Sequence, residues 1–351
     1  MTKTADPAGG LLEAARGQPE LLRQIAGLNI GIDGRLKPVT GLNSAKAHKL
    51  EKLYIAASGR NRGAAVAGKC ILEELARLTV EIVYLSELSP RSEPRGNEEA
   101  VLLVTDLEDL NDDAPINRNC QPKLRGEAGS LAGPGFIRLA LPVGLEISPA
   151  QSFSYYLSAL FFLGLEMGRL RGTLANEKAG MWIRDFSRLV SLAEETLVRR
   201  QSYEELAREA TSWHSVLLLG RGIHHAVAVE GAYWLNQIQG LHAEAFPAGE
   251  MKHGPNALLE KGRPVIVLAT SDKSDGNSQL RYRKTMANIV EVNARDGQVI
   301  AIAADGDEEI GEEVKDVRYV PAAPELLLPL LEIVPLQFLC WALKSASPIG
   351  T

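Results

Sequence analysis

The sequence predicts an α/β protein in which two similar units each contain a mainly parallel sheet. Short apolar runs that suit buried strands alternate along the chain with longer stretches that suit helices. Strands separated by helices favour a parallel sheet that is covered on both faces. A chain of 351 residues is long enough for two domains. Each unit is therefore expected to be a three-layer α/β/α sandwich.

The first half of the chain begins with Leu11–Ile25, an amphipathic segment that we interpret as an arm, with an ordinary surface helix as the alternative. Alanine and leucine, which favour helices, dominate the stretch after the glycine turn at Gly59. The predicted strands are Leu53–Ala57, Val80–Leu85, Ala100–Val104 and Gly135–Leu141, and the predicted helices are Ala64–Leu78 and Ser152–Gly168.

The second half repeats the order of strand, glycine turn and helix. Its predicted strands are His214–Leu219, Val265–Ala269 and Val299–Ala303. Its predicted helices are Met181–Arg200, Tyr203–Ala210, His224–Gln239, Asn277–Ala294 and Glu325–Lys344. We therefore divide the chain into an arm at residues 1–40, a first domain with a linker helix at residues 41–198, and a second domain at residues 199–351.

A short pattern at the same register links the two halves. Gly59 precedes Ala64–Ala67 by the same spacing at which Gly220 precedes His225–Ala228. Together with the repeated order of elements, this pattern indicates a tandem duplication.

The composition argues against several classes of protein. A formal net charge of −6, without an arginine-rich strip, argues against nucleic-acid binding. The cysteines are far apart in sequence and the amino-terminal residues lack an apolar signal core, so we expect a cytoplasmic protein with reduced thiols. Glu332 and Pro335 interrupt the apolar stretch Leu326–Leu343, which favours a buried helix over a membrane span.

Functional side chains are concentrated in Glu230–Pro255, which reads EGAYWLNQIQGLHAEAFPAGEMKHGP and follows LGRG at Leu219–Gly222. A buried strand, a glycine turn and a helix that opens with free amides form an arrangement that binds anions. After the break at Gly240, we expect a polar loop that carries His242, Glu244, Glu250, Lys252 and His253.

The segment Glu244–Pro255 closely resembles the second sugar isomerase (SIS) domain of the isomerase half of glucosamine-6-phosphate synthase and its relatives. The family pattern is approximately LGRG, EGALKLKE and HAEAYAAGELKHGP. The resemblance covers roughly residues 11–345. It implies two tandem SIS domains, a homodimer, and a sugar phosphate or related small carbohydrate derivative as the ligand.

The same resemblance shows where the second half departs from the family. Trp234 and Gln237 stand where the family has a lysine and the glutamate that moves the proton. A carboxamide has no basic lone pair at neutral pH, so Gln237 can orient a hydroxyl but cannot take a proton. His253 matches the histidine associated with opening of the sugar ring. Glu230 also matches the family, as an auxiliary or a structural carboxylate.

Other features of the second half provide no covalent catalyst, metal site or cofactor site. Glu250 and Lys252 match the family, and either ligand binding or packing between subunits would explain them. The tail Ser345–Thr351 lacks the family's lysine, and we expect no glutaminase domain before the first repeat. The neighbours His224–His225 lack the spacing of a metal site, and Gly220–Gly222 is too short for a dinucleotide fingerprint. We therefore expect neither a metal nor a cofactor.

In the first half, the family holds the sugar phosphate with two loops. Arg60 and Asn61 replace the family's Thr-Ser after Gly59 in the first loop, and Arg62 follows. Two arginines could grip a phosphate through paired hydrogen bonds. Alternatively, they could pair with nearby carboxylates in solvent, where such pairs contribute little.

The second loop keeps a hydroxyl at Thr105, but three carboxylates have entered it: Asp106, Glu108 and Asp109. Like charges about 4 Å apart repel by roughly 1 kcal/mol in water and by more in a cleft. This loop is therefore not expected to hold phosphate as the family does. We place further ligand contacts at Gln151 and Ser152, whereas Phe153 replaces a family lysine.

These observations support two functions of different classes. The first is a binding protein for a phosphosugar or another carbohydrate derivative, in which catalysis is lost with the base, the lysines, the phosphate loop and the tail. The second is an active aldose–ketose isomerase or amino-sugar-phosphate deaminase that uses His253 as its acid–base group.

Overall fold

The computed structural model describes residues 7–40, 42–87, 98–104, 131–133, 136–138, 147–239 and 241–346. The chain forms two compact units. The first unit comprises Arg23–Ile147 and Ser152–Ser187, and the second comprises Met1–Leu22, Ser148–Gln151 and Arg188–Thr351. Two helices contribute to both units, α1 (Pro7–Asn29) and α7 (Asn176–Val198). The domain limits that we drew at residues 40 and 198 remain predictions.

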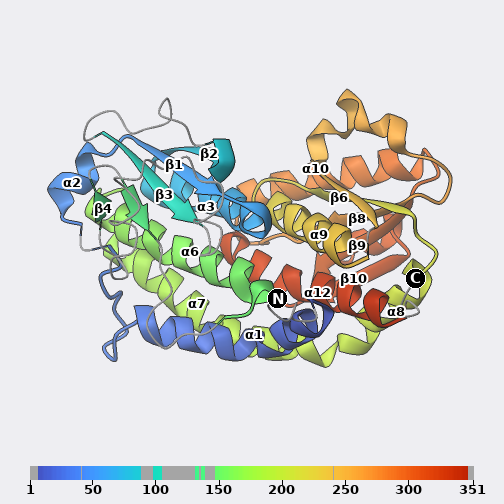
Figure 1. The fold of residues 1–351 in the computed structure, drawn as a ribbon, viewed down its shortest axis with the longest axis horizontal. Helices are drawn as coiled ribbons and strands as arrows, with labels where there is room; N and C mark the ends of the chain where they lie inside the picture. The colour runs from blue at the N-terminus through green and yellow to red at the C-terminus, as the bar shows by residue number, and fades with distance from the viewer. Residues whose placement is uncertain are drawn as a thin grey trace, which may run out of the picture. The chain divides into compact units, whose positions relative to one another are not determined.

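The first unit contains a five-stranded sheet of order β2-β1-β3-β5-β4 (Figure 1). Its neighbouring strands are parallel except for β4, which runs antiparallel to β5. The strands are β1 (Lys52–Ala57), β2 (Thr79–Tyr84), β3 (Glu99–Val104), β4 (Leu131–Gly133) and β5 (Phe136–Arg138). Helices of this unit include α2 (Ser44–Lys49), α3 (Arg62–Ala76) and α6 (Ser152–Leu170).

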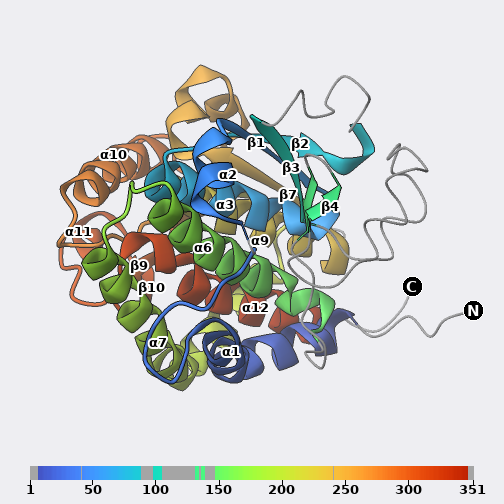
Figure 2. The ribbon, with the colours of Figure 1, turned by 90° about the vertical axis from the view of Figure 1, so that its left-hand side faces the viewer.

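Glycines allow α3 and α6 to pack closely side by side (Figure 2). A Cβ atom on Gly68 would lie 2.5 Å from Leu160 Cδ1, and one on Gly168 would lie 2.6 Å from the carbonyl oxygen of Leu75. Later residues of α3 therefore meet later residues of α6, so the two helices run in the same direction. Their N-termini lie at the same end of the pair.

The second unit contains a fully parallel five-stranded sheet of order β10-β9-β8-β6-β7. Its strands are β6 (Ser215–Gly220), β7 (His242–Pro247), β8 (Pro264–Leu268), β9 (Gln298–Ala304) and β10 (Asp316–Val320). The main helices are α8 (Arg200–Ala210), α9 (His224–Gln239), α10 (Gly276–Asn293), α11 (Ile310–Glu313) and α12 (Pro329–Ala346).

Helices cover both faces of this second sheet, as the alternation of side chains along β6 shows. Leu217 belongs to a buried cluster that includes Ile289 of α10. Its neighbour Leu218 points to the other face, where a Cβ atom on Gly231 of α9 would lie 2.8 Å from Leu218 and 2.7 Å from Leu336 of α12. The second unit is therefore a three-layer α/β/α sandwich.

The carboxy-terminal helix is a core element of this unit. Residues Glu325–Ser345 are long and apolar enough to cross a membrane, with a mean hydropathy of 2.0, but 89% of that window is buried inside the structure. Within the second unit, α12 packs against α8 and α9 (Figure 1). This burial supports the prediction of a core helix.

Two details of the sequence interpretation are wrong. The expected polar loop after Gly240 begins instead with β7, an edge strand that pairs with β6 through six register positions. The alignment of the two halves at their glycine turns also differs from the one that we predicted. Gly59 and Gly222 each lie two residues after the end of a central strand and have positive φ angles of 41° and 60°, so Gly59 corresponds to Gly222 rather than Gly220.

Candidate functional site

A sharp turn connects β1 to α3 in the first unit and places the predicted ligand loop. Gly59 has a φ of 41°, a left-handed conformation that glycine adopts without strain. It opens the 3-10 turn η1 (Gly59–Asn61), and α3 follows directly. The loop therefore lies at the carboxyl end of a central parallel strand, where ligands of open α/β sheets bind.

Asn61 is the most unusual residue of this loop. Its side chain is 0% exposed, and neither its amide oxygen nor its amide nitrogen hydrogen-bonds within the part of the chain that the structure describes. A buried polar group without a partner costs about 1–3 kcal/mol. Asn61 thus carries hydrogen-bonding capacity, at the N-terminus of a helix, that the described residues do not use.

Arginines flank Asn61. The guanidinium of Arg62 lies over the ring of Tyr84, 3.9 Å from its centroid, and its buried Nη1 has no hydrogen-bond partner among the described residues. Arg60 is partly buried. Thr105 and the carboxylates proposed as partners of these arginines lie outside the described residues.

The N-terminus of α6 completes this region of the first unit. Ser152 is the first residue of α6 and is buried, and α6 packs against η1. Because α3 and α6 run in the same direction, their N-termini lie at the same end, where the helix dipoles favour negative charge. Phe153 is fully buried, so the residue that replaces the family lysine fills the core.

Gln151, the other predicted contact of this segment, belongs to the second unit. It ends the short turn η4 (Pro149–Gln151), and its Oε1 accepts a hydrogen bond of 3.0 Å from the backbone N–H of Ser148. Gln337 of α12 anchors the same turn by donating to the carbonyl of Ala150 at 3.0 Å. The side-chain oxygen of Gln151 therefore supports a local turn.

The predicted catalytic positions on α9 have contrasting environments. Glu230 is 1% exposed, and its carboxylate accepts a hydrogen bond of 2.7 Å from the indole N–H of Trp234. Gln237 lies on the exposed end of the same helix. Trp234, which we predict to stand at the position of the family lysine, thus holds the buried carboxylate, and the Gln237 carboxamide, predicted to stand at the position of the family base, is exposed.

The turn η5 (Ala248–His253) follows β7 and presents the remaining predicted residues. The side chains of Glu250, Lys252 and His253 are all exposed.

Arg221, in the loop after β6, lies against this turn. A Cβ atom on Gly249 would lie 3.1 Å from the guanidinium nitrogens of Arg221, which also donates a 2.9 Å hydrogen bond to Asn288. Burial lowers the pKa of Arg221, and the nearby Glu250 opposes this shift.

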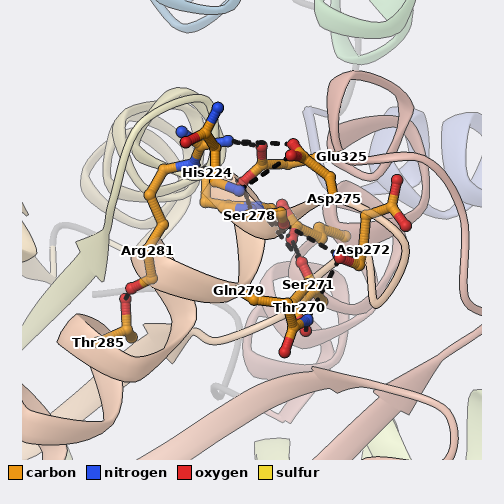
Figure 3. Close-up of polar contacts among 12 residues, drawn as sticks. His224, Thr270, Ser271, Asp272, Asp275, Ser278, Gln279, Arg281, Thr285 and Glu325 are labelled. Atoms are coloured by element: carbon orange, nitrogen blue, oxygen red, sulfur yellow. Dashed lines mark hydrogen bonds and ion pairs between the residues drawn. The ribbon is translucent and has the colours of Figure 1, made fainter.

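A second polar cluster, which the sequence did not predict, lies in the second unit at the start of α9 (Figure 3). His224 is buried, with Nδ1 2.7 Å from Oε1 of Glu332 and Nε2 3.5 Å from Oε1 of Glu325. The Thr270 hydroxyl donates to Glu332, and Arg281 binds the Glu325 carboxylate through two hydrogen bonds. The cluster joins α9, α10, α12, the short turn that contains Glu325, and the loop that follows β8.

The charges of this cluster stabilise one another. Burial by itself lowers the pKa of His224, but the carboxylates of Glu332 and Glu325 outweigh burial and raise this pKa to about 10. Burial raises the pKa of Glu325, but the nearby imidazole of His224 and the hydrogen bonds from Arg281 outweigh that effect and lower the pKa to about 2. His224 and Glu325 are therefore both charged at neutral pH.

The loop after β8 is also held by its own groups (Figure 3). Ser278 Oγ accepts a 3.0 Å hydrogen bond from the backbone of Asp272, and Asp275 caps α10 by accepting from the N–H of Asn277 at 2.9 Å. Within the described ranges, no group of three or more His, Cys, Asp or Glu side chains could hold a metal ion.

Sequence reasoning considered His224 only as a neighbour of His225 and found no metal spacing. Its partners come from η7 (Glu325–Leu327), α12 and the loop that follows β8, so no local pattern reveals them. A signal was present in Glu332, because an acidic residue inside an apolar helix requires a buried partner.

Comparison with known proteins identifies relatives of this arrangement. Residues 210–344 match the family described as SIS domain. The chain is 37% identical over 302 residues to glutamine–fructose-6-phosphate aminotransferase [isomerizing] of Thermus thermophilus, with 84% of this chain and 49% of that protein covered. The protein with the same name from Chlorobaculum tepidum is 31% identical over 335 residues, with 92% and 53% covered. The chain thus spans about half the length of these relatives.

The fold has similar solved structures as well. The C-terminal domain of glucosamine-fructose-6-phosphate aminotransferase from Francisella tularensis superposes with a TM-score of 0.79 at 22% identity, covering 95% of both chains. This likeness concerns the fold. Together with the matches in sequence, it shows that residues 210–344 form a SIS domain and that the chain resembles the isomerase half of glucosamine-6-phosphate synthase.

Proposed function

We propose that this protein binds a sugar phosphate or a related small carbohydrate derivative in its first unit and does not isomerise it. The observation that carries the proposal is Asn61, which is buried at the turn between β1 and α3 and has no hydrogen-bond partner in the described part of the chain. A functional site explains why such a group persists where an apolar residue would be more stable.

The same region suits an anionic ligand. The N-termini of α3 and α6 contribute partial positive charge, and the Arg62 guanidinium has a buried nitrogen that the described residues leave without a hydrogen bond. The names of the relatives contain fructose-6-phosphate. A phosphorylated sugar therefore fits both the local charge and the relationship.

The environment of α9 supports binding without isomerisation. Interconversion of an aldose and a ketose requires a base that moves a proton between neighbouring carbons. Gln237 cannot accept that proton, and Glu230 is buried and bonded to Trp234. Loss of one acid–base group commonly lowers a rate by about 10²–10⁴.

The proposal includes the remaining family expectations. Both units place a central strand, a positive-φ glycine and a helix in the same order, which supports two tandem SIS domains. We expect a homodimer, as the resemblance implies, and a cytoplasmic location, as the widely spaced cysteines indicate.

Thermal unfolding in the presence of ligands tests this function. Fructose 6-phosphate and glucosamine 6-phosphate at millimolar concentrations are expected to raise the unfolding temperature. A ligand at 100 times its dissociation constant adds about 2.7 kcal/mol of stability. Absence of a shift with both compounds, or rapid interconversion of a hexose 6-phosphate by the purified protein, would contradict the proposal.

An active isomerase or deaminase is the second candidate, and the exposure of His253 favours it. His253, Glu250 and Lys252 lie on one short turn and are accessible to a ligand. In this case, the wild-type protein turns over a hexose 6-phosphate and His253→Ala abolishes that turnover. Turnover that survives His253→Ala excludes this role for the histidine.

A further inference from the structure

We infer that Asn61 selects the carbohydrate by pairing its carboxamide with two neighbouring hydroxyls of the ligand, and not with a phosphate. The inference rests on the proposed function, because it concerns the same site in the first unit. In this view, Asn61 determines which carbohydrate binds, and other groups of the protein recognise the negative charge of the ligand.

The two units provide an internal comparison for Asn61. This residue lies four positions after the end of β1 at Ala57, and His224 lies four positions after the end of β6 at Gly220. Both side chains are buried at the start of a helix. Asn61 and His224 therefore occupy corresponding positions in the architecture of their units.

The partners at these corresponding positions differ. His224 is bound by carboxylates of its own chain, at 2.7 Å from Glu332 and 3.5 Å from Glu325 (Figure 3). The carboxamide of Asn61 is equally buried, yet no side chain or backbone group in the described ranges hydrogen-bonds to it. The second unit supplies internal partners for its polar group, whereas the described residues of the first unit supply none, and we assign these bonds to a ligand.

The chemistry of a carboxamide determines which ligand group fits. Asn61 offers two N–H donors and one carbonyl acceptor side by side. A phosphate at neutral pH mainly accepts hydrogen bonds, so it would leave the Oδ1 atom of Asn61 buried and unpaired, which is unfavourable. Two neighbouring hydroxyls satisfy both sides, because one can donate to Oδ1 while the other accepts from the amide nitrogen.

Other groups at this end of the sheet are suited to the phosphate. The guanidinium of Arg62 is held over the ring of Tyr84, and its buried Nη1 donates no hydrogen bond to the described residues. The N-termini of α3 and α6 supply further positive potential. Hydroxyl recognition by Asn61 and anion recognition by Arg62 are thus separate functions of one site.

Substitution of Asn61 separates these functions experimentally. Asn61→Leu replaces the carboxamide by an apolar side chain of similar size, and Asn61→Ser restores the hydroxyl that the family has there. Binding of fructose 6-phosphate, fructose and inorganic phosphate to the full chain is measured by calorimetry and by thermal shift. Arg62→Gln serves as the matched control for the anion.

We expect Asn61→Leu to unfold at a higher temperature than the wild type without ligand, because it removes the unpaired group. Asn61→Leu should bind fructose 6-phosphate at least tenfold more weakly than the wild type, with an unchanged affinity for inorganic phosphate. The affinity of Asn61→Ser for fructose 6-phosphate should lie between those of the wild type and Asn61→Leu. Arg62→Gln should weaken fructose 6-phosphate and inorganic phosphate alike and leave fructose unchanged.

Two results would overturn the inference alone. One is unchanged affinity of Asn61→Leu for fructose 6-phosphate, and the other is an equal loss of affinity for inorganic phosphate and sugar phosphate. Failure of the wild type to bind any of the three compounds would overturn the proposed function, and the inference would fall with it.

Discussion

Replacement of His224 by alanine is expected to destabilise the second unit strongly. Glu332 is 0% exposed, and without the imidazolium its remaining hydrogen-bond partner in the described structure is the Thr270 hydroxyl. Breaking a buried ion pair by removing one partner costs about 3–5 kcal/mol, because an uncompensated charge stays buried. For a unit of this size, such a loss lowers the unfolding temperature by roughly 6–20 °C.

Urea unfolding followed by far-ultraviolet circular dichroism measures this loss as a change in the free energy of unfolding. The matched control is the double variant His224→Leu/Glu332→Leu, which replaces the whole pair by apolar side chains. Such replacements are often neutral or stabilising, so we expect the double variant to recover most of the loss. A free energy of unfolding for His224→Ala within about 0.5 kcal/mol of the wild type, as expected of a surface substitution, would refute the buried ion pair.

The stability difference between the wild type and His224→Ala should depend on pH. The pKa of His224 is raised from 6.5 to about 10 in the folded state. Its contribution to the free energy of unfolding is therefore complete below pH 6.5 and is lost as the pH rises towards 10. Because the pKa of Glu325 is lowered from 4.5 to about 2, its contribution is present above pH 4.5 and is lost as the pH falls towards 2. The difference between wild type and His224→Ala should therefore shrink between mildly acidic and strongly alkaline pH, and a constant difference would contradict the ion-pair assignment.

Three other substitutions test separate parts of the structure. Gln237→Glu alone should not produce turnover of fructose 6-phosphate in a coupled assay, because the predicted phosphate loop still departs from the family pattern; measurable turnover would disprove this. Trp234→Phe removes the hydrogen bond to the buried Glu230 and should lower the free energy of urea unfolding by about 1.5–3 kcal/mol, whereas no loss would show that this bond is unimportant. Gly68→Val places a side chain against Leu160 between α3 and α6 and should destabilise the first unit by about 1–3 kcal/mol in thermal unfolding, while an unchanged midpoint would mean that the helices separate easily.

Local patterns in the sequence were sufficient for most of the regular elements. The predicted helix at residues 224–239 has the bounds of α9, and the apolar runs at residues 53–57 and 100–104 lie within β1 and β3. Apolar periodicity and helix-breaking residues act over a few positions, so they can be recognised without knowing the fold. The edge strand β7 was missed because it pairs on one side only and carries polar residues such as His242 and Glu244.

By itself, the sequence determined the α/β class and the family relationship, and it predicts that Gln237 stands where the family has its proton-moving residue. Only the tertiary structure decided which polar side chains are buried and which have partners. It enclosed His224 between Glu325 and Glu332, and it left the equally buried Asn61 without a hydrogen bond in the described residues. Burial and pairing depend on elements that are far apart along the chain, and no local pattern of residues encodes those distances.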